Sequence, residues 1–99
     1  MLQIKLSQAA AAQRRIPFYL VQDGDGKTPV TGLTFAAGDV KVSKDGAAEG
    51  NSLGTVTEIA GGLYYYEATQ AEVDTLGFLT TRVIKATVRV FVGIVQIIT

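Results

Sequence analysis

Apolar and polar side chains alternate along several short stretches of the chain. A period of two residues is typical of a β-strand that buries one face. The segments expected to be strands are residues 16–21, 28–33, 39–44, 54–59 and 63–68, then 78–84 and a last strand that ends at Ile98. Pro17 lacks the N–H that a sheet interior needs, so its strand is expected at a sheet edge or to start there. Short strands separated by turns, without alternating helices, predict an all-β sandwich or barrel.

Turn-forming residues lie between the expected strands. Asp and Gly alternate in Asp23–Lys27, the dipeptide Asp45-Gly46 follows one strand, and Ala60–Gly62 separates two others as the turn of a hairpin. These residue types adopt the backbone angles that tight turns need. No Gly, Pro, Asn or Asp separates the last two strands, and we place their turn at Lys85–Thr87.

One short helix is expected near the middle of the chain. Thr69 and Glu72 have the spacing of a capping box, in which a hydroxyl and a carboxylate bond to each other's backbone N–H groups. The helix is predicted over Gln70–Leu76. Gly77 is expected to end it, because glycine readily adopts the left-handed conformation found after helices.

The first fifteen residues are interpreted as an N-terminal arm, and residues 16–99 as the β-sandwich domain. The arm begins with an alternating stretch, residues 1–6, which indicates a half-buried strand, and continues through an Ala/Gln-rich stretch that closes with two arginines. The apolar residues of its first stretch are Leu2, Ile4 and Leu6, and the arginines are Arg14 and Arg15. Nothing in this segment obviously completes a compact core, so we expect it to dock onto a neighbouring subunit.

The composition narrows the function classes. Hydrophobic residues make up 47% of the 99 residues, which is enough for a core, and nine basic residues balance nine acidic ones. A neutral chain has no general attraction to nucleic acid or to an anionic membrane, and no self-repulsion between copies. The chain has no cysteine and no histidine, which removes disulfides, thiolate metal sites and the commonest general base. The apolar residues 83–98 are interrupted by Lys85, Arg89 and Gln96, so no membrane-spanning helix is expected.

No constellation of residues indicates catalysis or a cofactor. Asp23 and Asp25 resemble the start of a calcium loop, but Thr34 stands at its closing position and Pro29 interrupts it, so a turn is favoured. The serines have no histidine to activate them. A glycosidase needs two acids that face a cleft, which a chain of this length does not readily build. We therefore expect a protein that is not an enzyme and has no catalytic, cofactor-binding or metal-binding residues.

The last part of the chain indicates a contact surface. Alternation places valines on one face of the final strand and Phe91 on the other, so both faces are apolar, which is unusual for an isolated antiparallel sandwich. Either an outer layer or a neighbouring subunit must cover one face, and we favour the subunit. Alternation also separates Tyr65 from Tyr64 and Tyr66, and one set must be partly exposed. The candidate interface residues are Leu2, Ile4, Leu6, Arg14, Arg15, Tyr65, Val88, Val90, Phe91 and Val92.

Three groups of residues together resemble one known family. They are Pro17–Asp23 through Thr34 with Val40–Gly46, then Gly54–Ile59 through Tyr65, and then Thr69–Gly77. These stretches resemble the small immunoglobulin-like domain found in structural proteins of tailed phages and prophages. The resemblance covers about residues 16–84. The family usually has a Gly/Asp-rich turn before its last strand, whereas residues 87–92 here are apolar.

The resemblance implies an immunoglobulin-like antiparallel sandwich with one short helix and a role in the virion. A single domain of this kind with an arm and no other module is similar to a capsid decoration or cement protein on the phage head surface. Its expected partners are the major capsid protein and further copies of itself, in a homo-oligomer such as a trimer, and neither nucleic acid nor a membrane. The alternative is a tail-associated or adhesion module that binds a host receptor or glycan.

Overall fold

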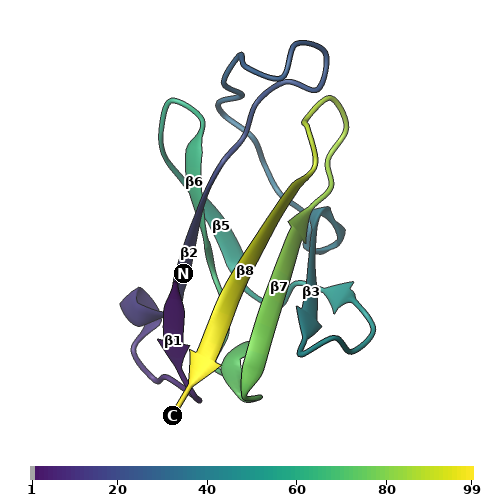
Figure 1. Cartoon of the computed structure of the whole chain (residues 1–99). Coiled ribbons are helices and arrows are strands. Elements are labelled where there is room, and N and C mark those ends of the chain that lie inside the picture. The colour runs from purple at the N-terminus through teal and green to yellow at the C-terminus, as the bar shows by residue number, and fades with distance from the viewer. Residues whose placement is uncertain (1) are drawn as a thin grey trace.

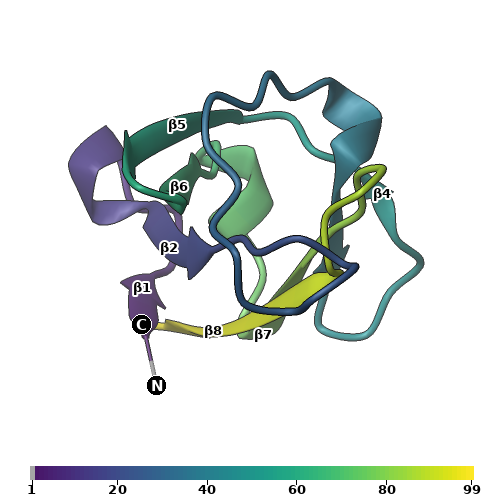
Figure 2. The ribbon, with the colours of Figure 1, turned by 90° about the horizontal axis from the view of Figure 1, so that it is seen from above.

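Two β-sheets pack face to face in the computed structural model, which describes residues 2–99 (Figures 1 and 2). The larger sheet has five strands in the order β1-β8-β7-β3-β4, and the smaller has three in the order β2-β6-β5. The larger sheet consists of β1 (Gln3–Lys5), β8 (Phe91–Ile98), β7 (Gly77–Val83), β3 (Val40–Lys44) and β4 (Gly50–Asn51). The smaller sheet consists of β2 (Arg15–Tyr19), β6 (Leu63–Glu67) and β5 (Thr55–Ala60). The predicted all-β class is confirmed.

The strands pair antiparallel, except that β1 runs parallel to β8. The last strand therefore lies inside the larger sheet, with β1 on one side and β7 on the other (Figure 1). Pro17 lies in β2, which is an edge strand, as predicted. Residues 28–33, expected to form a strand, make only an isolated bridge between Val21 and Pro29.

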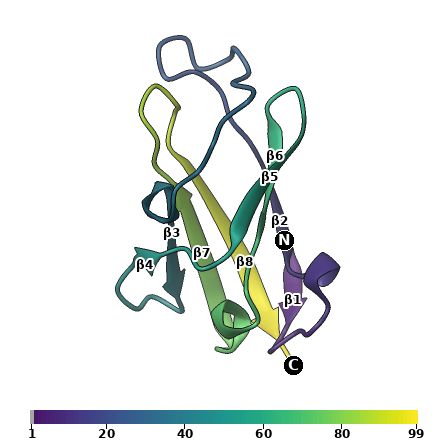
Figure 3. The ribbon, with the colours of Figure 1, turned by 180° about the vertical axis from the view of Figure 1, so that it is seen from behind.

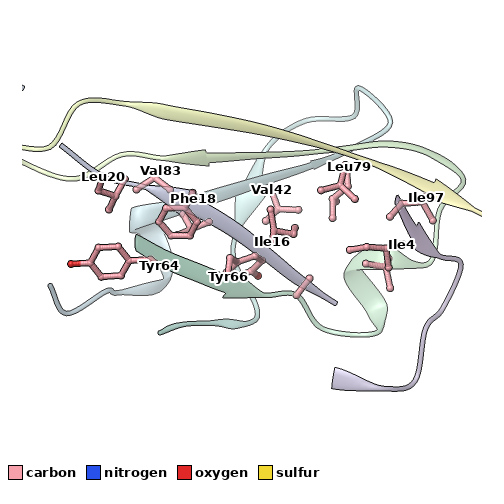
Figure 4. Close-up of a cluster of buried hydrophobic side chains, with 14 of the residues drawn as sticks. Ile4, Ile16, Phe18, Leu20, Val42, Tyr64, Tyr66, Leu79, Val83 and Ile97 are labelled. Carbon is pink, nitrogen blue, oxygen red and sulfur yellow. The ribbon is translucent and has the colours of Figure 1, made fainter. Parts of the chain in front are cut away.

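The core fills the space between the two sheets, and its members follow the predicted alternation (Figure 4). Tyr64 and Tyr66 point into the core while Tyr65, between them, is half-buried on the outer face, so the predicted division of the three tyrosines is confirmed. Phe18 stacks on Tyr64, with 5.9 Å between the ring centroids and 12° between the planes. The core residues are Ile4, Ile16, Phe18, Leu20, Val40, Val42, Tyr64, Tyr66, Ala68, Val73, Leu79, Val83, Val88, Val95 and Ile97.

The predicted turns are present. Gly61 and Gly62 both have positive φ between β5 and β6, as do Asp45 and Gly46 after β3. The last two strands turn at Ala86 and Thr87, within the predicted segment, and the backbone N–H of Val88 donates to the carbonyl of Lys85. Thr87 has a φ of +68°, which a β-branched residue rarely adopts.

The predicted helix over Gln70–Leu76 is wrong in length, because only a single 3-10 turn, Ala71–Val73, forms. The predicted capping box is nevertheless present: the Thr69 N–H donates to Glu72 Oε1 at 2.9 Å, and the Glu72 N–H donates to Thr69 Oγ1 at 3.3 Å. The turn ends early because Val73 is fully buried in the core and β7 begins at Gly77. Two further 3-10 turns cover Ala11–Gln13 and Ala37–Asp39.

The first residues are built into the sandwich, which corrects the expectation that residues 1–15 lie outside the core. Ile4 is 2% exposed because the parallel pairing of β1 with β8 turns its side chain inward, beside Ile97 (Figure 4). Beyond β1, the Ser7 N–H donates to the Val73 carbonyl at 2.9 Å. The segment therefore forms an edge of the larger sheet in its own chain.

Candidate interaction surfaces

The outer face of the five-stranded sheet carries an exposed apolar stripe. The outer apolar stripe consists of Phe78, Val90, Val92 and Ile94, whose side chains are 48–53% exposed. Alternation positions Phe78, Val92 and Ile94, because Leu79, Val95 and Ile97 on the same two strands point into the core, whereas Val90 is exposed in the segment just before β8. Ile94 lies opposite Thr80, and Phe78 lies on the diagonal from it, so the apolar side chains of β7 and β8 are neighbours.

The charges beside this stripe are neutralised within the chain. Arg82 lies opposite Val92 and holds Glu49 through two hydrogen bonds of 2.6 and 3.0 Å. The same hydrogen bonds lower the pKa of Glu49 below its ordinary value. Near the other end of β7, Lys44 pairs with Asp74 at 2.9 Å, which lowers the pKa of that carboxyl. Arg82 and Lys44 thus each have an acidic partner, whereas Lys41, opposite Arg82 on the neighbouring strand, bonds to the amide of Asn51.

The outer face of the three-stranded sheet is also partly apolar. Tyr19 is opposite Leu63, and Pro17 is opposite Tyr65. Tyr19 and Leu63 are exposed, whereas Tyr65 is half-buried because the guanidinium of Arg15 lies 4.7 Å from its ring centroid. Arg15 also donates to Glu67 at 3.1 Å, so its charge is compensated. The three-stranded sheet lies on the other side of the molecule from the five-stranded sheet (Figures 2 and 3), so this face of aromatic, proline and aliphatic side chains is opposite the stripe.

The four edge strands are poorly suited to pair with another chain. β1 has three residues and β4 has two. β2 contains Pro17, which cannot donate to a ladder, and β5 is irregular between Glu58 and Ala60. Short strands, prolines and bulges are common protections of sheet edges. The two outer faces are therefore the larger surfaces open to contact.

The ten candidate interface residues fall into four groups. Those that are exposed or half-exposed on an outer surface are Leu2, Arg15, Tyr65, Val90 and Val92. Leu6 and Phe91 are partly buried against the core of their own chain. Arg14 is half-buried, and its guanidinium donates to the backbone carbonyls of Ala68, Gln8 and Ala9 rather than to an acidic group.

Ile4 and Val88 are the corrected members of that set, because both are core residues. Ile4 is buried by the pairing of β1. Val88 has the same parity as Val90 and Val92, yet it precedes β8 and pairs with Gln22 in an isolated bridge, so the loop carries its side chain inward. Parity along a strand cannot place a residue that lies in the turn before the strand.

Sequence reasoning missed two residues of the outer apolar stripe, Phe78 and Ile94. Ile94 was detectable, because it has the same parity as Val92 within one strand. Phe78 was harder to detect. Its parity partners in β7 are Thr80 and Arg82, which are not apolar, so alternation gives no sign that Phe78 belongs to an apolar stripe.

A buried polar network links Tyr66 of β6 to the two segments that connect the sheets, near the 3-10 turn Ala71–Val73. The Glu72 carboxylate is buried and accepts hydrogen bonds from the Tyr66 hydroxyl at 2.6 Å and from the Leu53 N–H at 3.2 Å, besides the capping bond of Thr69. Burial, reinforced by the bond to Glu72, raises the pKa of the Tyr66 hydroxyl above its ordinary value. The hydroxyl of Tyr66 in turn accepts from the Gly54 N–H at 2.9 Å. These bonds fix the chain where it enters β5.

The hollows of the surface offer little chemistry. One, of about 460 Å³, lies between residues 33–37 and 52–56, and none of its lining residues is titratable. A second, of about 540 Å³, lies at the tip formed by residues 22–24, Val30 and Thr87, with Asp23 as its one acid. At this tip Asp25 accepts from the N–H groups of Lys27 and Thr28, each at 3.0 Å, which is the turn favoured over a calcium loop.

Within residues 2–99, no group of three or more acidic side chains is arranged to hold a metal ion, and no helix has the length and apolarity to cross a membrane. No protein-family model, no curated protein and no solved structure matches this chain. The class of protein is therefore defined by the fold and its surfaces alone. It is an all-β, two-sheet domain whose accessible features are two opposed, partly apolar faces.

Proposed function

We propose that this chain is a structural protein of a bacteriophage particle, a capsid decoration or cement protein that stabilises the head through contacts between subunits. The outer apolar stripe carries the proposal, because a contiguous exposed apolar patch on a single domain is often a contact site. The phage assignment rests on the resemblance of residues 16–84 to the virion domain family. The proposal includes no catalytic role and no cofactor.

We infer that the sandwich is immunoglobulin-like. In that arrangement one sheet contains strands B, E and D, and the other contains G, F and C, with C′ added in variable-type domains. The order β2-β6-β5 matches B-E-D, and β8-β7-β3-β4 matches G-F-C-C′. The central hairpin of β5 and β6 and the short turn before β7 support the same assignment. The resemblance and the strand order are independent arguments for this finer description.

The contacts of the proposed protein are made by its faces. Pairing of the first and last segments with a neighbouring subunit would require free backbone groups, yet β1 and β8 are paired with each other. A contact between faces needs no free strand edge and buries apolar area directly. The major capsid protein and further copies of the chain are the proposed partners, at the surface of the head.

The proposal is tested with heads that lack this protein. Purified chain is mixed with such heads and sedimented through a gradient, and the heads are then heated and scored for release of DNA. We expect stoichiometric binding and a higher temperature of release. A role in the capsid would be refuted if heads bound no chain, or if they bound no more of it than isolated tails do.

A second function is favoured by the outer face of the three-stranded sheet. Exposed Tyr19, half-buried Tyr65 and Pro17 form an aromatic surface, and aromatic faces bind sugars and receptor side chains through stacking. This face supports the alternative of a tail-associated or adhesion module. Binding of the chain to host surface glycans, lost in a Tyr19→Ala variant while binding to heads is absent, would favour it.

A further inference from the structure

We propose that the outer apolar stripe is a self-association surface, whose occupant is the same stripe of a second copy of this chain. The inference deepens the proposed function, on which it rests, by assigning one face to contacts between copies. It leaves the opposite face, with Tyr19 and Tyr65, for a different partner. The assignment depends on the apolar area of the stripe, on the charges around it and on the poor suitability of the four edge strands for pairing with another chain.

The area of the stripe fits a dimer. Large apolar side chains carry on the order of 150–200 Å² of accessible surface each, so the half-exposed Phe78, Val90, Val92 and Ile94 leave roughly 300–400 Å² of apolar surface per copy. A stable interface buries about 800 Å² per partner, of which somewhat more than half is apolar. The stripe thus supplies most of the apolar centre, and the polar side chains around it supply the rim.

The charge of the surface fits a copy of itself. A two-fold contact places a surface against its own image, so an unpaired charge near the centre would meet a like charge. The stripe has no charged member. The charged residues at its border are Arg82, which Glu49 neutralises, and Lys41, which lies one strand further from the stripe and bonds to Asn51. The whole chain carries nine basic and nine acidic residues, so two copies do not repel each other at long range.

The symmetry follows from the use of a single face. A surface that contacts its own image forms a closed pair, whereas a trimer needs two different patches that meet head to tail. We therefore expect a two-fold dimer as the unit made by the stripe. A larger assembly would need a second contact, for which the opposite face is available.

Sedimentation equilibrium of the full chain tests the inference. The wild-type chain is expected to sediment at twice its 10.5 kDa. Ile94→Lys places a charge in the middle of the stripe and should weaken the dimer about 100-fold or more, since a buried unpaired charge is strongly disfavoured. The matched control is Leu63→Lys on the opposite outer face, which should leave the dimer unchanged. Because both side chains are exposed, both variants should fold, which their circular dichroism spectra would show.

A cross-linking measurement keeps the test decisive if the lysine variants fold poorly. The chain has no cysteine, so a single introduced thiol can react only with its copy. Thr80→Cys, opposite Ile94 in the stripe, should form a covalent dimer with a short bis-maleimide, whereas Thr57→Cys on the other sheet should not. A wild-type chain that stays at 10.5 kDa at about 1 mM, or equal cross-linking of both variants, would overturn the inference.

The outcomes also separate this inference from the proposed function. A monomeric chain that binds heads would overturn the dimer and leave the capsid role standing. A dimer that depends on Ile94 but does not bind heads would overturn the capsid role and leave the self-association surface standing.

Discussion

Replacing Tyr66 with phenylalanine removes one hydroxyl from the centre of the buried polar network. That hydroxyl donates to Glu72 Oε1 at 2.6 Å and accepts from the Gly54 N–H at 2.9 Å. The ring stays in the core, where it fills the same volume. The substitution therefore leaves a buried carboxylate without its shortest donor and a backbone N–H without its acceptor.

The expected loss of stability follows from these two bonds. A hydrogen bond to a charged group contributes about 1.5–3 kcal/mol and a neutral one about 0.5–1.5 kcal/mol, and groups left unsatisfied in the interior cost amounts in that range. Because Glu72 keeps the Thr69 and Leu53 N–H groups, we expect Tyr66→Phe to lower the free energy of unfolding by about 2–4 kcal/mol. For a domain of about 100 residues this corresponds to a fall in Tm of roughly 10–25 °C.

Urea unfolding followed by circular dichroism measures this change, with thermal unfolding as a second readout. The matched control is Tyr65→Phe, whose hydroxyl makes no hydrogen bond within residues 2–99 and which should change stability by less than about 0.5 kcal/mol. A Tyr66→Phe variant as stable as this control would refute the role assigned to the network. In that case burial of the ring, and not its hydroxyl, would hold the chain between β4 and β5 in place.

Four further predictions test other parts of the structure. Ile4→Ala should lower the free energy of unfolding by about 2–4 kcal/mol in urea titrations, because the side chain lies in the core. An unchanged free energy of unfolding would instead support the interpretation of residues 1–15 as an arm outside the core. Thr87→Gly should raise stability by up to about 1 kcal/mol, because glycine adopts a φ of +68° without strain; any loss contradicts strain at this turn. By NMR, the carboxyl of Asp25 should titrate with a pKa of about 2, because the Lys27 and Thr28 N–H groups bond to its charged form. The stability that these bonds contribute is complete above pH 3.8 and is lost as the pH falls through 2. Titration near 3.8 would contradict the turn geometry. The pKa of Tyr66 is raised on folding, so wild-type stability should fall as the pH rises above 10.0, and this fall should be smaller in Tyr66→Phe.

The elements that could be predicted from the sequence are those set by local chemistry. Alternation places Tyr64 and Tyr66 inside and Tyr65 outside, and a capping box forms between Thr69 and Glu72 as their spacing predicts. The helix that this box was expected to start is only one 3-10 turn, because the distance from the buried Val73 to β7 leaves no room for more. Local signals identify the start of an element, whereas its length depends on packing that the sequence does not reveal.

The place of the first residues could not be predicted for a related reason. The alternation of Leu2, Ile4 and Leu6 correctly indicates a strand, but it does not identify the partner of that strand. Only the parallel pairing of β1 with β8, which joins residues more than ninety positions apart, brings Ile4 into the core. The alternation within each segment does not show that the two segments pair with each other. Both faces of the last strand were correctly recognised as apolar. The inner face packs in the core of the same chain, so only the outer face is left for a partner.

The outer face of β8 determines how this domain can contact other molecules. β8 has its two edges covered by β1 and β7 and its inner face covered by the core, so only the side of Val92 and Ile94 faces outward. The other edges are short, or contain Pro17, or are bulged, so growth by strand addition is blocked on every side. A protein that must bind neighbours without polymerising into fibres needs this combination of closed edges and open faces. The arrangement therefore favours a joining role in a finite assembly, because a two-fold contact through one face closes after two copies, whereas free strand edges can add copies without limit.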